Sequence, residues 1–273
     1  MRSPAVLLAL LLHASHASAA PDHGKEVCLA SGESGSPLHR CLLDGKFGPV
    51  WNGKQVQKHK ALRAWAERWF SVGSAHVGWT SSGEQRTVRV KSHYFDGDLG
   101  VPIVEFDATV ALVSSGPLDL RVVPSAAGAL TAKERSSLDA EVQRLWARAI
   151  KSRSPDDPVD NRFTLGEPKI LGVPGAPGLR TVFFPVSLGP GKDTRGSFFF
   201  LLDRAGKVTF GRFGHIEWSP GASADEVAKF VPLFFFRIGA DPTTYLLADY
   251  SGAWESWGLV AVIDPVRAQV VSF

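Results

Sequence analysis

The side chains best suited to contact a ligand lie near the C-terminus, in the stretch GAWESWG. Trp254 and Trp257 flank Glu255, and Tyr250 lies a few residues before them. Positions three apart on one extended strand face opposite ways, but the flanking glycines predict a bent segment on which both indoles could lie together. Aromatic faces beside a carboxylate suit a sugar ring or a cationic group. The alternative is that the rings only pack the core and Glu255 faces water.

Two further groups have the residue types for acid–base chemistry. His215 and Glu217 lie two apart in FGHIEW, so on a strand they share one face and could exchange protons or bind a metal. His93 lies near Asp96 in SHYFDGDLG, where Asp-Gly is typical of a hairpin turn. His215 and Glu217, with His93 or Asp96, define an alternative function, an exported metal- or acid/base-dependent hydrolase, which requires His93 and His215 to be close in space. A solvent-exposed pair and a simple turn explain the same residues without chemistry.

Other catalytic patterns are missing from the sequence. It has no G-x-S-x-G, and the Gly/Ser loop around Ser34 lacks the histidine and aspartate context of a serine nucleophile. It has no H-E-x-x-H, its histidines are scattered, and it has neither glycine-rich nucleotide-binding pattern. No cofactor and no bound metal are therefore expected, and a non-enzymatic function is favoured.

The first twenty residues, MRSPAVLLALLLHASHASAA, have the features of a signal peptide. Arg2 precedes an apolar run that is too short to span a bilayer, and Ala17 to Ala19 supply the small-x-small cleavage pattern. We expect cleavage after residue 19 and a soluble chain, secreted or periplasmic, with no integral membrane span. The high Gly and Ala content with a single Met suits a bacterial source.

Only two cysteines occur, Cys28 and Cys41. In an exported chain such a pair predicts a disulfide, and closing a loop of this length is worth roughly 3 kcal/mol in the chain-entropy model. A metal site that uses both cysteines and His39 lacks a fourth ligand in the local spacing.

Composition and charge narrow the partners. The chain has 273 residues, 44% of them hydrophobic and 21% charged, with a formal net charge of +3, which fits a globular protein. Its lysines and arginines form no cluster, so neither a nucleic-acid groove nor a polybasic membrane patch is expected. A protein or glycan ligand remains possible.

Three segments predict helices. The stretch KALRAWAERWFSVG has apolar residues at helical spacing, LTAKERSSLDAEVQRLWARAIKS begins with a capping box of Thr131 and Glu134, and SADEVAKF begins with one of Ser223 and Glu226. The second of these has a single apolar stripe, made of Leu138, Val142, Leu145, Trp146 and Ile150.

Runs of short apolar strands separate these helices, and DRAGK reads as a tight hairpin turn. The predicted fold class is α+β, with antiparallel β-rich sheets each covered by an amphipathic helix in a helix-then-meander rhythm that occurs about three times. The expected division is a signal peptide at 1–19, a disulfide-containing segment at 20–56, α+β units at 57–152 and 162–273, and a linker at 153–161. The sequence thus favours an exported soluble binding or structural module.

Overall fold

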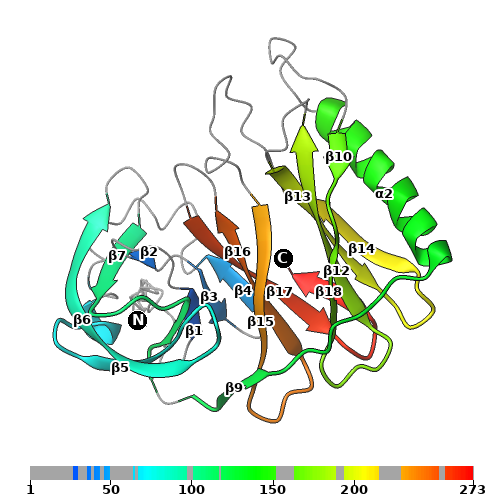
Figure 1. The fold of residues 1–273 in the computed structure, drawn as a ribbon. Helices are drawn as coiled ribbons and strands as arrows, with labels where there is room; N and C mark the ends of the chain where they lie inside the picture. Colours follow the sequence, from blue (N-terminus) through cyan, green and yellow to red (C-terminus); the bar gives the residue numbers. More distant parts are fainter. Residues whose placement is uncertain are drawn as a thin grey trace, which may run out of the picture.

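The computed structural model describes residues 27–29, 36–37, 40–43, 46–49, 64, 67–96, 101–116, 118–151, 163–188, 194–214, 229–251 and 256–272, some strand ends by backbone alone. These residues form three sheets in which every neighbouring pair of strands is antiparallel. Figure 1 shows the sheets as successive layers, with the helix α2(Ala132–Lys151) on one outer side.

The N-terminal sheet has eight strands. Their order across the sheet is β2(Ser36–Pro37), β7(Val101–Phe106), β6(Gln85–Asp96), β5(Ala75–Trp79), β8(Leu112–Ser114), β1(Val27–Leu29), β3(Arg40–Leu43) and β4(Lys46–Pro49). The β6–β7 pairing confirms the hairpin predicted around the Asp-Gly pair, since Asp96 lies opposite Val101.

The middle and outer sheets hold most of the C-terminal strands. The middle sheet runs β18(Gln269–Ser272), β17(Ser256–Asp264), β16(Thr244–Ser251), β15(Lys229–Ile238) and β9(Leu120–Val123). The outer sheet runs β10(Phe163–Leu165), β12(Arg180–Leu188), β13(Thr194–Leu202) and β14(Val208–Phe213), and β11(Lys169–Gly172) also pairs with β12. The predicted DRAGK turn is confirmed between β13 and β14, where Asp203 Oδ1 accepts from the amides of Ala205 and Lys207.

One segment joins these two sheets along one side. The residues that follow β9 lie beside β11: the amide of Gly172 donates to the carbonyl of Ala126, and the amide of Gly128 donates to the carbonyl of Ile170. The stretch from 120 to 128 therefore pairs first with the middle sheet and then with the outer sheet. This closes one side of the sandwich.

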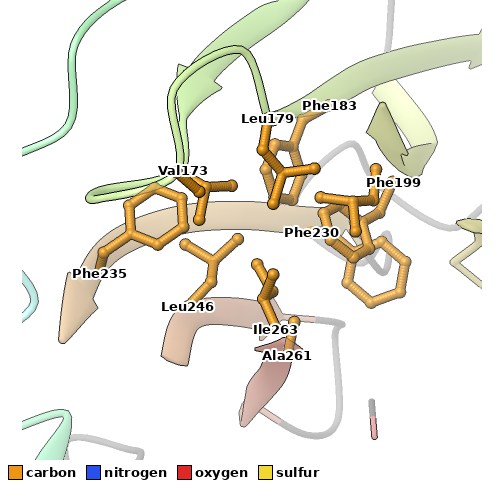
Figure 2. Close-up of a cluster of buried hydrophobic side chains, with 11 residues drawn as sticks. Val173, Leu179, Phe183, Phe199, Phe230, Phe235, Leu246, Ala261 and Ile263 are labelled. Carbon is orange, nitrogen blue, oxygen red and sulfur yellow. The ribbon is translucent and has the colours of Figure 1, made fainter. Parts of the chain in front are cut away.

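Strand alternation explains the phenylalanine-rich runs. In β13, Phe199 and Leu201 face the middle sheet, whereas Phe198, Phe200 and Leu202 face α2. A strand covered on both faces must be apolar at successive positions rather than at alternate ones. Figure 2 shows the cluster between the two sheets, with Phe199 and Phe183 facing Leu246 and Ile263.

The middle sheet is also covered on both faces. Phe235 lies in the cluster with the outer sheet, while Phe234 and Phe236 pack on the opposite side with Trp79 and Leu112 of the N-terminal sheet. The layers are therefore α2, outer sheet, middle sheet and N-terminal sheet (Figure 1).

Helix α2 begins as the sequence predicts. The amide of Thr131 donates to Glu134 Oε2 at 2.8 Å and the amide of Glu134 donates to Thr131 Oγ1 at 3.3 Å, which confirms the capping box. The predicted apolar stripe packs on β12 and β13: Leu138, Val142, Leu145 and Trp146 are buried and Ile150 is partly buried.

The predicted α+β fold with a repeated helix-then-meander rhythm is wrong. Among the described residues, strands dominate and α2 is the one helix of seven or more residues. Within the described part of the first expected helix, only Ala64 and Glu67–Trp69 are helical. At the third, Lys229 and Phe230 belong to β15, while Ser223 and Glu226 lie outside the described residues. Helix α2 covers the outer sheet, whereas the middle sheet is covered by a sheet on each face.

In the portion of the chain that the structure describes, no helix combines the length and the apolar character needed to cross a bilayer. The predicted signal peptide and the linker at 153–161 lie outside that portion.

Candidate functional site

The predicted aromatic site lies at the hairpin between β16 and β17. Tyr250 and Trp257 are direct register partners on these strands, and Phe230 of β15 is the partner of Tyr250 on its other side. The three positions form one row across the end of the middle sheet, and we call them the aromatic row. Trp254 and Glu255 lie outside the described residues. The strands reach Ser251 and Ser256, so Trp257 belongs to a strand and not to the bend that was expected.

The register also assigns the aromatic row to one face. The ladder between β16 and β17 continues without a shift, so positions 250 and 257 have the parity of Leu246 and Ala261, which face the outer sheet. Phe230 lies at the end of that same cluster and is 4% exposed (Figure 2). The row therefore lies where the space between the two sheets ends.

The acid–base residues are only partly placed. His215 and Glu217 lie outside the described residues, so their approach to His93 stays a prediction. His93 is the partner of Val104 and Asp96 that of Val101, in a stretch of ladder without a bulge. Positions 93 and 96 therefore alternate to opposite faces of β6, which does not favour joint action. Among the described residues, no group of three or more His, Cys, Asp or Glu side chains could hold a metal ion.

A polar cluster that the sequence interpretation missed lies at the start of β5. The Oγ of Ser74 lies 2.7 Å from Nε2 of His76, and Nδ1 of His76 lies 3.1 Å from the carbonyl oxygen of Ser114. His76 is buried, and its ring lies against Phe70 with 4.9 Å between ring centroids. Ser74 directly precedes β5 and is two residues from His76, and the hydrogen bond between them shows that both side chains lie on one face.

Burial dominates the electrostatics of this histidine. Loss of solvent lowers the pKa of His76, and the hydrogen bond with the Ser114 carbonyl raises it by a smaller amount. The carbonyl oxygen can only accept, so the bond to Ser114 requires the proton on Nδ1. In the neutral ring Nε2 is then an acceptor aimed at the Ser74 hydroxyl. The same i, i+2 rule that paired His215 with Glu217 would have found Ser74 and His76.

A second buried polar group serves structure. Glu134 Oε1 pairs with Arg180 Nη2 of β12, and Arg180 Nη1 donates to the Ala129 carbonyl at 2.9 Å. Hydrogen bonds from Arg180 and from the amide of Thr131 lower the pKa of Glu134 to about 2. Each partner is occupied in joining α2 to the outer sheet, so this pair has no group left for chemistry.

Cys28 is buried and disulfide-bonded, and its register partner across β1 and β3 is Cys41. Directly opposed positions of an antiparallel pair have Cα separations within the range that a disulfide spans. The strand pairing thus fits the link that the cysteine count predicts.

Comparison of the chain with protein-family models, with curated proteins and with solved structures finds no match in any of the three.

Proposed function

We propose that this chain is an exported recognition module that binds its ligand at the aromatic row. The observation behind the proposal is the register of Tyr250 with Trp257, because directly opposed residues have Cβ atoms about 4.5–5.5 Å apart and can form one joint surface. Phe230 continues that row onto a third strand and, being 4% exposed, supports it from the core side. The predicted signal peptide assigns the working place to the periplasm or the medium.

The position of the row favours a flat, partly apolar ligand. Side chains such as Phe199 and Leu246 fill the space between the two sheets behind the aromatic row, so the row lies against a rigid apolar core. Rigid aromatic surfaces on a sheet suit sugar rings, whose apolar faces stack while their hydroxyls stay in water. We therefore propose a glycan as the first ligand class to test and an aromatic-containing peptide as the second.

The test is a titration of intrinsic tryptophan fluorescence with neutral oligosaccharides and short aromatic peptides. Trp257→Phe and Tyr250→Ala should weaken a saturable response about tenfold, since a stacking contact worth about 1.4 kcal/mol changes Kd by that factor. Tyr94→Ala is the matched control, because Tyr94 is 51% exposed on β6 of the N-terminal sheet.

Two outcomes would overturn the proposal. In one, no member of either ligand class gives a saturable response with the folded parent chain. In the other, the response survives both row variants while their unfolding midpoints fall, so that the rings only close the core.

A further inference from the structure

We propose that Ser74 and His76 form a nucleophile–base pair that hydrolyses small neutral esters, independently of the aromatic row. The pair has the arrangement that such catalysis needs: a serine hydroxyl within hydrogen-bond reach of an imidazole, whose other nitrogen is fixed by a third group. The distances are 2.7 Å for Ser74 Oγ to His76 Nε2 and 3.1 Å for His76 Nδ1 to the Ser114 carbonyl.

The positions of the protons follow from the acceptors around the ring. Because the Ser114 carbonyl holds the single proton of a neutral imidazole on Nδ1, Nε2 presents its lone pair to Ser74. The Ser74 hydroxyl has a second acceptor, the Ser71 carbonyl, at 2.6 Å. That carbonyl also accepts from the amide of Ser74 at 2.9 Å, so it stays hydrogen-bonded when the hydroxyl turns to His76.

The surroundings keep the histidine neutral and in place. The ring is buried against Phe70, which is itself fully buried and meets Phe106 edge-on. Burial and the Ser114 carbonyl are the two causes that act on the pKa of His76, and no charged side chain is among them. A neutral imidazole at neutral pH is the form that can accept a proton.

The turn before β5 gives the hydroxyl an approach from solvent. Ser74 is half-buried and closes a turn through the hydrogen bond from its amide to the Ser71 carbonyl. Within the same turn, the amide of Gly73 donates to the Val90 carbonyl of β6 at 2.8 Å. Val72 projects from this turn with 61% of its surface exposed. An exposed apolar side chain two residues from the nucleophile suits a short apolar acyl group, and a neutral ester needs no charged partner.

The reaction balances without a cofactor. Ser74 Oγ attacks the ester carbonyl carbon and its proton passes to Nε2; the ester C–O bond then breaks, and the alcohol leaves with that proton. Water attacks the acyl-serine and gives a proton to Nε2. Breaking the acyl–Oγ bond releases the acid, and Ser74 recovers its proton from His76.

A fluorophosphonate probe tests the nucleophile on the intact mature chain. Ser74 Oγ attacks the phosphorus of the probe, the P–F bond breaks and fluoride leaves, and the hydroxyl proton passes to His76 Nε2. Peptide mass spectrometry should therefore place one phosphonyl adduct on Ser74, and Ser74→Ala should abolish it. His76→Gln should slow labelling at least about 100-fold, the usual contribution of a positioned base. Ser82→Ala should label like the parent: Ser82 is exposed at the other end of β5 and bonds Thr80 at 2.8 Å, without an imidazole partner.

The parent chain alone also decides the matter if His76→Gln does not fold. Its labelling rate should rise with pH as His76 loses its proton, with a midpoint below the ordinary histidine pKa of about 6.5, because burial lowers the pKa of His76. A folded parent chain with no Ser74 adduct between about pH 5 and pH 9 would overturn the proposal. Equal labelling of Ser82 would also overturn the proposal, as would a labelling rate that does not change with pH over the range in which His76 loses its proton. A failure here leaves the ligand titration at Trp257 unaffected, and the reverse also holds.

Discussion

The interface between the outer and middle sheets and the corner at Ser74 and His76 are both buried, yet their interiors differ in kind. Between the sheets, the interior is mostly phenylalanine and aliphatic side chains, such as Phe183 stacked on Phe199 at 4.9 Å. At the corner, a histidine, a serine and two carbonyls are joined by hydrogen bonds. Apolar packing holds the two sheets at one relative position, whereas the hydrogen bonds around Ser74 and His76 determine which atoms carry protons.

This difference assigns separate roles to the two regions. Strands with both faces covered are mostly apolar, and the few buried polar residues on them, such as Ser197, make hydrogen bonds within the fold, so the sandwich supplies stability and a rigid end for the aromatic row. The start of β5 borders an exposed turn, so its polar groups can satisfy one another and still reach solvent. Predictions that separate stability from proton chemistry therefore test the comparison directly.

The largest effect is expected for Phe199→Ala. Phe199 is fully buried between the sheets, so its loss should lower the free energy of unfolding by about 3–5 kcal/mol through lost burial and a residual cavity. Denaturant unfolding followed by circular dichroism measures this. Phe210→Ala is the control, because Phe210 packs against the same cluster but is only partly buried and should cost less. Equal costs would contradict the ranking of the two sites.

Replacement of Cys41 by Ser should have the next largest effect. Opening the loop between Cys28 and Cys41 should lower the free energy of unfolding by about 3 kcal/mol, and the parent should lose a similar amount in reductant. Peptide mapping without reduction identifies the link itself. A parent chain that has two free thiols after oxidative refolding would contradict the pairing. A loss of about 3 kcal/mol would show that the N-terminal sheet is stabilised by a covalent link, whereas the other two sheets are stabilised by apolar packing.

Breaking the Glu134–Arg180 pair should cost about 2 kcal/mol in Glu134→Ala, which loses both the cap and the partner of Arg180. Glu134→Gln should cost less, because an amide can still accept from the Thr131 amide. The folded-state pKa of about 2 lies below the ordinary value of 4.5, so this stabilisation is present above about pH 4.5 and lost as pH falls toward 2. Thermal unfolding of parent and Gln variant across that range measures it. A constant difference would contradict the ion pair.

Gly206→Ala should cost about 1–2 kcal/mol plus a steric term. Gly206 has φ +77°, a region that disfavours a side chain, and an added Cβ would meet the Glu134 carboxylate. Gly239→Ala isolates the backbone part, since Gly239 has φ +60° and nothing within 4 Å of its added Cβ. Denaturant unfolding gives a midpoint for each variant, and the difference between the Gly206→Ala and Gly239→Ala midpoints measures the contact between the β13–β14 turn and α2. A smaller loss at Gly206 than at Gly239 would contradict that contact.

The sequence predicted local features better than it predicted the fold. The capping box at Thr131, the stripe of α2 and the turn at Asp203 depend on neighbours in the chain, so pattern rules find them. The prediction of a repeated helix-then-meander pattern was wrong, because tertiary packing and not the local sequence decides whether a helix or another sheet covers a given sheet. The runs FFF at 198–200 and 234–236 show this: nothing in their letters says that β15 lies between two sheets.

The site residues show the same limit. Tyr250 and Trp257 are seven apart, and only the hairpin register makes them partners. Ser74 and His76 were within reach of a two-residue spacing rule, but Ser114 comes from a strand that sequence alone does not place beside them. Residues joined by a turn or a strand could thus be predicted, whereas those joined by sheet pairing could not.

The smallest expected effect on stability, and the sharpest test of the comparison, is the pH dependence conferred by His76. Burial lowers the folded-state pKa of His76 below the ordinary value of 6.5, so in the range between the two values the unfolded chain binds more protons. The contribution to stability is therefore complete above about pH 6.5 and is lost as pH falls from there to the folded-state pKa. The parent should lose stability over that range relative to His76→Gln, and NMR titration of the His76 ring reports the pKa itself. A value at or above 6.5 would mean that the corner prefers the imidazolium, with Nε2 donating to Ser74 and Ser74 to the Ser71 carbonyl. That single result would remove the proposed base and make the corner a purely structural counterpart of the phenylalanine core.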